Sequence, residues 1–150
     1  MTRMGRIAAL AATLLAAPVL AADGPGADDL IVPAEGRTLD EYLWVRRPVV
    51  VFADNPADPR YVQQMQYITD RADALRDRDV VVLTDTSPGD RSAIRQALRP
   101  RGFMLVLIAK DGSTVLRKPF PWDVRELSRS IDKLPVRQQE VRDRRAEGQP

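Results

Sequence analysis

The stretch Pro48-Val49-Val50-Val51-Phe52-Ala53 decides the fold. It is apolar throughout and rich in β-branched side chains, and no polar residue alternates with the apolar ones. A strand with this pattern is buried on both faces, so it lies in the middle of a sheet that helices cover on both sides. The stretch therefore predicts a layered α/β domain.

Two further apolar runs lie downstream of this strand. Residues 79–84 and 103–108 are again dominated by Val, Leu and Ile and predict a second and a third buried strand. The pair Asp111-Gly112 then predicts a tight hairpin turn. Residues 114–118 therefore form the expected fourth strand, antiparallel to the third.

Helical patterns separate these strands. Asp58-Pro59 has the residue types of an N-cap and a first helical position. The apolar residues that follow it at helical spacing are Tyr61, Met65, Ile68, Ala72 and Leu75. A shorter helix is expected from Asp90 to Leu98, and a last amphipathic helix from Asp123 to Leu134. Right-handed crossovers then make the first two strands parallel in a three-layer α/β/α domain.

The N-terminus has the pattern of a secretory signal peptide. Arg3 and Arg6 precede the charge-free run Ile7 to Leu20, and the side chains before Ala21 suit a cleavage site. We expect residues 1–21 to be removed and the mature chain to be periplasmic or secreted, with no membrane span. The alternative is an uncleaved anchor, but the run is shorter than the roughly 20 apolar residues that a span needs.

The mature chain divides into three parts. Residues 22–37 are rich in Gly, Pro, Ala and Asp and predict a flexible leader. Residues 38–135 hold the predicted domain, and residues 136–150 predict a polar helical tail. Without Arg3 and Arg6 the numbers of basic and acidic residues are equal, so nothing indicates a nucleic-acid partner.

Composition excludes several kinds of chemistry. The chain has no Cys and no His, so it has no thiol nucleophile, no disulfide, no Ser-His-Asp triad and no imidazole or thiolate metal ligand. The acidic residues near 54–58 lack the twelve-residue pattern of a calcium loop. We therefore expect no metal and no cofactor.

Several strings resemble the DUF4174 family, exported thioredoxin-like domains of unknown function. They are Leu43-Trp44, residues 47–53, Asp58-Pro59-Arg60, residues 102–112 and residues 134–142. The resemblance implies a mixed four-stranded sheet with strand order 4-3-1-2. It brings no established catalytic residue to this chain.

The loop after the first strand is the first candidate for a binding surface. Redox-active thioredoxin-like proteins carry Cys-x-x-Cys there, at the N-terminus of the next helix, where the free N–H groups stabilise a thiolate. This chain has residues 54–59 instead, without sulfur, which excludes thiol–disulfide exchange and thiol peroxidase activity. We expect Asp54, Asn55, Asp58 and Arg60 to form a recognition edge; the alternative is that they only shape a turn and cap a helix.

Four more residues complete the candidate surface. Pro100 and Arg101 precede the third strand, near the position of the cis-proline of thioredoxins, although a trans helix stop is the alternative that we favour. Trp44 and Arg47 stand before the first strand. For Trp44 the alternative to ligand binding is packing on the edge of the sheet. For Trp122, which is not part of the candidate surface, packing against the last helix is expected. For the arginines it is ion pairing with the abundant Asp.

The sequence thus predicts an exported, cysteine-free, non-redox binding module of the bacterial periplasm or cell envelope. Its partner would be a protein, a peptide or another envelope component. The alternatives are a small hydrolase that uses carboxylates and arginine, and a structural envelope protein that acts through its tail. A hydrolase requires a carboxyl group with a raised pKa in a concave pocket, which separates it from a binding module.

Overall fold

The computed structural model describes residues 29–148. The predicted signal peptide and residues 22–28 of the leader lie outside the described residues. Five strands form one mixed sheet in the order β1-β3-β2-β4-β5. They are β1 (Ile31–Pro33), β2 (Arg47–Phe52), β3 (Val80–Asp85), β4 (Met104–Ile108) and β5 (Thr114–Lys118).

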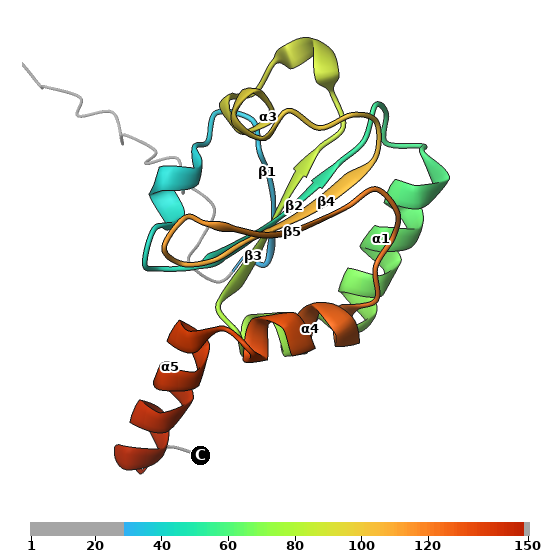
Figure 1. Ribbon diagram of the computed structural model, residues 1–150. Coiled ribbons are helices and arrows are strands. Elements are labelled where there is room, and N and C mark those ends of the chain that lie inside the picture. Colours follow the sequence, from blue (N-terminus) through green and yellow to red (C-terminus); the bar gives the residue numbers. More distant parts are fainter. Residues whose placement is uncertain (1–28, 149–150) are drawn as a thin grey trace, which may run out of the picture.

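Helices connect these strands and cover both faces of the sheet (Figure 1). Those of α type are α1 (Pro59–Asp70), α2 (Ala72–Arg76), α3 (Ala93–Leu98), α4 (Val124–Asp132) and α5 (Pro135–Ala146). Two short 3-10 helices, η1 (Leu39–Tyr42) and η2 (Pro88–Asp90), lie in the connections. Within residues 29–148 no helix is long and apolar enough to cross a membrane.

The central strand is β2, as its composition predicts. All six of its residues are buried. It pairs in parallel with β3 and antiparallel with β4, and β4 pairs antiparallel with β5. These four strands therefore have the order that the family resemblance implies, and the predicted α/β class is confirmed.

Alternate side chains of β2 lie in two separate hydrophobic cores, one on each face of the sheet. Val49 and Val51 pack in one core with α1, α2 and α4, through residues such as Ile68 and Leu127. The other core holds Val50, Phe52, Ile94, Leu98 and Tyr42, which belong to β2, α3 and η1. The predicted three-layer arrangement follows from this division.

A fifth strand corrects the expectation that residues 22–37 form a flexible leader. β1 pairs in parallel with β3, where Ile31 is the register partner of Val82. Val32 is buried and joins the second core. The strand has only three residues among Gly, Pro and Asp, which is too short for any periodicity to show.

Helix boundaries differ from the predicted ones in several places. The helix predicted through Tyr61 to Leu75 is divided at Arg71 into α1 and α2. Ser92 caps α3 by accepting a hydrogen bond from the Arg95 N–H at 3.0 Å, and Asp90 belongs to η2 instead. The predicted tail is helical and begins at Pro135, which takes the first helical position of α5. The preceding helix, predicted to reach Leu134, ends at Asp132. From there α5 projects away from the rest of the domain (Figure 1).

If β1 is an integral strand, charge at its buried position will unfold the domain and charge at its exposed position will not. Val32 is 5% exposed and Ile31 is 40% exposed. We expect Val32→Asp to cost about 3 kcal/mol or more, since it buries an unpaired carboxylate, and Ile31→Asp less than about 1 kcal/mol. Urea unfolding followed by circular dichroism measures both, and equal small effects would show that β1 does not contribute to the fold.

Candidate functional site

The predicted site residues divide between two opposite ends of the sheet. Asp54, Asn55, Asp58, Arg60, Pro100 and Arg101 lie at the end where β2 finishes, which we call the loop end. Trp44 and Arg47 lie where β2 begins, which we call the α5 end. At about 3.3 Å per residue, the two ends of β2 are roughly 20 Å apart. One ligand-sized site therefore cannot include all eight residues.

At the loop end, three predicted residues serve the local structure. Asn55 Oδ1 accepts a hydrogen bond from the Ala57 N–H at 2.9 Å. Asp58 caps α1 by accepting from the Arg60 N–H at 2.9 Å, and it also receives two bonds from the Arg60 guanidinium, at 3.1 and 2.8 Å. The side-chain bond, followed by the backbone bond, lowers the pKa of Asp58. The turn and cap roles considered above are thus present in the structure.

The segment before β4 meets this loop. Gly102 adopts a left-handed conformation with a φ of 60°, and a methyl group placed on it would lie 4.0 Å from Asp54 Oδ2. The Arg60 guanidinium lies 5.7 Å from the centre of the buried Phe103 ring. No peptide bond among residues 29–148 is cis, so Pro100 is a trans helix stop, as the favoured interpretation predicts. Two distant segments therefore share one surface.

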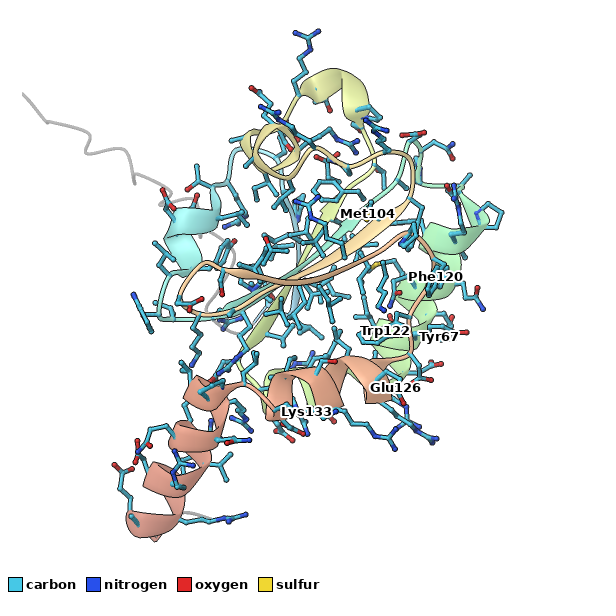
Figure 2. All side chains as sticks on the ribbon, in the orientation of Figure 1. Tyr67, Met104, Phe120, Trp122, Glu126 and Lys133 are labelled. Atoms are coloured by element: carbon cyan, nitrogen blue, oxygen red, sulfur yellow. The ribbon has the colours of Figure 1, made fainter. Side chains whose placement is uncertain are left out.

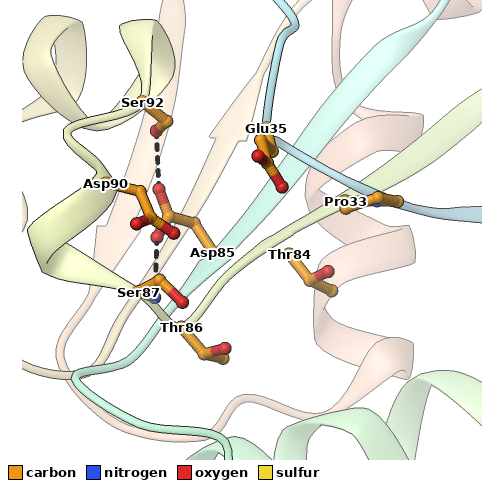
Figure 3. Close-up of a pocket in the computed structure, with 8 residues that line it drawn as sticks. All are labelled: Pro33, Glu35, Thr84, Asp85, Thr86, Ser87, Asp90 and Ser92. Carbon is orange, nitrogen blue, oxygen red and sulfur yellow. Dashed lines mark hydrogen bonds between the residues drawn. The ribbon is translucent and has the colours of Figure 1, made fainter.

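A small cavity of about 140 Å³ lies at the same end, beside β3 (Figure 3). Its central group is Asp85, which accepts hydrogen bonds from the Ser87 N–H at 3.2 Å and the Ser92 hydroxyl at 2.6 Å. Arg95 completes the set with bonds of 3.1 and 2.8 Å to the same carboxylate. Burial by itself raises the pKa of Asp85, but these donors outweigh it and lower the pKa.

Arg95 explains why this cluster is structural. Its guanidinium donates to the Ala53 carbonyl at 3.0 Å and the Asp85 carbonyl at 3.1 Å, and it lies 5.2 Å from the centre of the Phe52 ring. It therefore fastens α3 to the ends of β2 and β3. The sequence prediction missed this pair, since only the tertiary fold brings the two residues together.

At the α5 end, Arg47 is a correction to the predicted binding surface. Its side chain has no exposed area. Its guanidinium donates to the Arg78 carbonyl at 2.8 Å and to Glu140 at 2.9 Å. Lys110 bridges the same Glu140 oxygen, at 2.9 Å, and Asp79, at 2.8 Å. The ion-pair alternative therefore holds for Arg47, and its position in a buried strand is the reason.

The electrostatics of this network are concentrated on Glu140. Burial raises its pKa, but hydrogen bonds from Lys110 and Arg47 outweigh that effect and lower the pKa from 4.5 to about 2. Arg137, one helical turn away, also pairs with Glu140, at 3.3 Å. These contacts attach the first turns of α5 to the central strand.

The two tryptophans have different environments. Trp44 is 67% exposed and left-handed, with a φ of 61°, so the expectation that it packs on the sheet edge is wrong. Its N–H donates to the Lys110 carbonyl at 2.7 Å, which holds the backbone and turns the indole outward. Trp122 packs against the first core, between α1 and the start of α4 (Figure 2). Its backbone exchanges two hydrogen bonds with Gln64, of 3.1 and 2.7 Å.

The chemistry available to these groups is limited. Among residues 29–148, no set of three acidic side chains is placed to hold a metal ion. The carboxyl groups whose pKa is displaced are Asp58, Asp85, Asp111 and Glu140, and in each the displacement is downward. A group of this kind is an ionised acceptor and a poor proton donor near neutral pH.

Comparisons with known proteins agree with the fold. The model of the family described as "Domain of unknown function (DUF4174)" matches residues 38–140. A reduced 2-Cys peroxiredoxin of Plasmodium vivax is 14% identical, with a TM-score of 0.54 over 69% of this chain and 84% of that chain. Thioredoxin peroxidase I of Plasmodium yoelii is 15% identical, with a TM-score of 0.50 over 67% and 79%. No curated protein matches the chain.

The Glu140 contacts generate a pH-dependent prediction. A carboxyl group whose pKa is lower in the folded state stabilises the fold above its unfolded pKa, and this contribution is lost as the pH falls through the folded value. We expect Glu140→Gln to lower the free energy of unfolding by about 2 kcal/mol at pH 7, a figure that allows for the partly exposed side chain. The difference in free energy of unfolding between the variant and the unmodified chain should become smaller as the pH falls from about 5 to about 2.

Glu147→Gln is the matched control, because that carboxylate is exposed near the end of the same helix. Urea titrations at several pH values give both free energies. A deficit that is independent of pH would contradict the assigned ion pairing.

Proposed function

We propose that this chain, which belongs to the DUF4174 family, is an exported, non-redox binding module of the bacterial periplasm or cell envelope. The peroxiredoxins that share its fold are named for two cysteines or for peroxidase activity. This chain keeps the fold without any cysteine. A scaffold of that kind still presents the loop after its central strand, and without a thiol the loop acts by recognition.

The meeting of two loops at Asp54 and Gly102 carries this proposal. Asp54 and Arg101 are exposed, and neither side chain has a hydrogen-bond partner among the described residues. The N–H groups of Arg101 and Gly102 donate to no backbone group there either. An extended peptide pairs with free backbone groups of this type, while flanking charges select its side chains. We therefore assign the loop end to an extended peptide segment of a protein partner.

Two observations weigh against the alternatives. A hydrolase of this kind needs a carboxyl group that remains protonated near neutral pH. In the carboxyl groups of residues 29–148 whose pKa is displaced, the pKa is lowered below its ordinary value. A structural protein that acts through its tail would use α5 as its contact surface, independently of the domain. Glu140 instead ties α5 to Arg47 and Lys110, which favours a recognition surface on the domain.

Export predicts a specific product. In a bacterial host, the chain should appear in the periplasmic fraction with the mass of residues 22–150, or one residue less. Leu14→Arg places a charge in the apolar run and should keep the full-length chain in the cytoplasm. Intact-mass spectrometry of each fraction measures the outcome. Full-length protein in the cytoplasm for the unmodified chain as well as for Leu14→Arg would contradict export.

A photo-crosslinking residue at Asn55 or Arg101 should capture a discrete partner in the same host, whereas one at the exposed Arg71, beyond the far end of α1, should not. Gly102→Ala should reduce capture several-fold, because a side chain in the left-handed region costs roughly 1 kcal/mol or more and shifts the loop. Gly89→Ala is the control, with open space around it. Equal capture from all three positions, or no loss in Gly102→Ala, would refute the assignment.

A further inference from the structure

A groove of about 490 Å³ lies along one face of α5, at the opposite end of the sheet from the loop end. Its charged lining comes from Arg137, Arg142 and Arg145 on α5, from Arg78 before β3, and from Asp132 at the end of α4. Four guanidinium groups thus face a single carboxylate. Its volume lies within the range of about 300–1,000 Å³ that small-molecule ligands occupy.

Only one of the four cations is fully paired within the groove. Arg78 binds Asp132 through two hydrogen bonds, of 2.9 and 2.8 Å, and also donates to the Ala74 carbonyl at 2.7 Å. This fork-like pairing uses both oxygens of Asp132. The remaining positive charge therefore belongs to the α5 side of the groove.

Arg137 is paired more weakly than Arg47, the other arginine of this end whose Nε is buried without a hydrogen-bond partner. Arg137 is 7% exposed, and its Nε is buried without a hydrogen-bond partner. Its guanidinium makes two long ion pairs, one with Glu140 at 3.3 Å, which is also its one hydrogen bond to a described group, and one from Nε to Asp132 at 3.8 Å. Glu140 is already shared with Arg47 and Lys110. Both ion pairs are longer than charge-assisted hydrogen bonds usually are, so this guanidinium can gain from a further anion beside it.

The other two arginines of the groove follow Arg137 on the same helix. Arg142 and Arg145 come five and eight residues after it, and the side chains of all three line the groove. Arg142 donates to Gln139 at 2.7 Å, and Arg145 has no ion pair among the described residues. Several guanidinium groups that approach from different directions suit an anion with three or more oxygens better than a single carboxylate.

We propose that this groove binds a phosphate monoester or diester group carried by an organic molecule. The anion would sit between Arg137, Arg142 and Arg145, and the rest of the molecule would occupy the space toward Arg78 and Asp132. The site is independent of the peptide surface assigned to the loop end, because it lies at the other end of β2.

The test uses purified residues 22–150 at constant ionic strength. Titration with glycerol phosphate, followed by NMR shifts and thermal stability, should give saturable changes at α5. Arg142→Gln/Arg145→Gln should weaken binding roughly tenfold or more, because each charge-assisted hydrogen bond is worth about one order of magnitude in affinity. Arg129→Gln, which removes an exposed arginine of α4 outside this groove, should bind as the unmodified chain does.

Vesicles with and without phosphatidylglycerol form the second arm. Binding of glycerol phosphate alone identifies a free organophosphate, and binding of phosphatidylglycerol vesicles identifies a lipid headgroup; either result supports the site if it depends on Arg142 and Arg145. Failure of both probes, or equal binding by the double variant, would overturn the proposal. Neither outcome bears on crosslinking at Asn55 or Arg101, so the two assignments fail separately.

Discussion

A guanidinium group with no contact to solvent stands at the first position of the central strand. A buried charge of this kind destabilises a fold unless it is paired, and removing its partner typically costs more than the pair contributes. Arg47 finds its partners in the Arg78 carbonyl, before β3, and in Glu140, on α5. The pairing of this one strand residue therefore attaches the C-terminal helix to the central strand.

The two ends of β2 consequently differ in which groups remain available for a ligand. At the loop end, Asp58, Asp85 and Arg95 are committed to caps and ion pairs, and what remains free is backbone and a few exposed side chains. At the α5 end, cations outnumber the carboxylates that can reach them. The first arrangement suits recognition of another chain, and the second suits an oxygen-rich anion.

Local patterns in the sequence predicted what local physics decides. The four longer strands, the cap at Asp58 and the class of the fold follow from runs of apolar residues and from turn chemistry, and the structure and the family match confirm them. β1 escaped prediction, since three residues leave no period to detect. The pairing of Arg47 with Glu140 joins residues far apart in the chain, and the left-handed Trp44 depends on a hydrogen bond to Lys110. No pattern of neighbouring residues encodes such contacts. The signal peptide remains a prediction.

The strand order has a consequence for the route by which this protein folds. The β4–β5 hairpin is a local pairing, but β2 pairs with β3 across α1 and α2, Ile31 pairs opposite Val82, and Val49 opposite Leu107. Pairings between residues this far apart in the chain require long loops to close first, and loop closure costs conformational entropy. The central strand acquires its second neighbour only once β4 is available, so an incomplete chain that ends before residue 104 has no finished sheet. The sheet is therefore completed only when most of the chain is available, which is compatible with the export proposed above, since an exported chain crosses the membrane before it becomes compact.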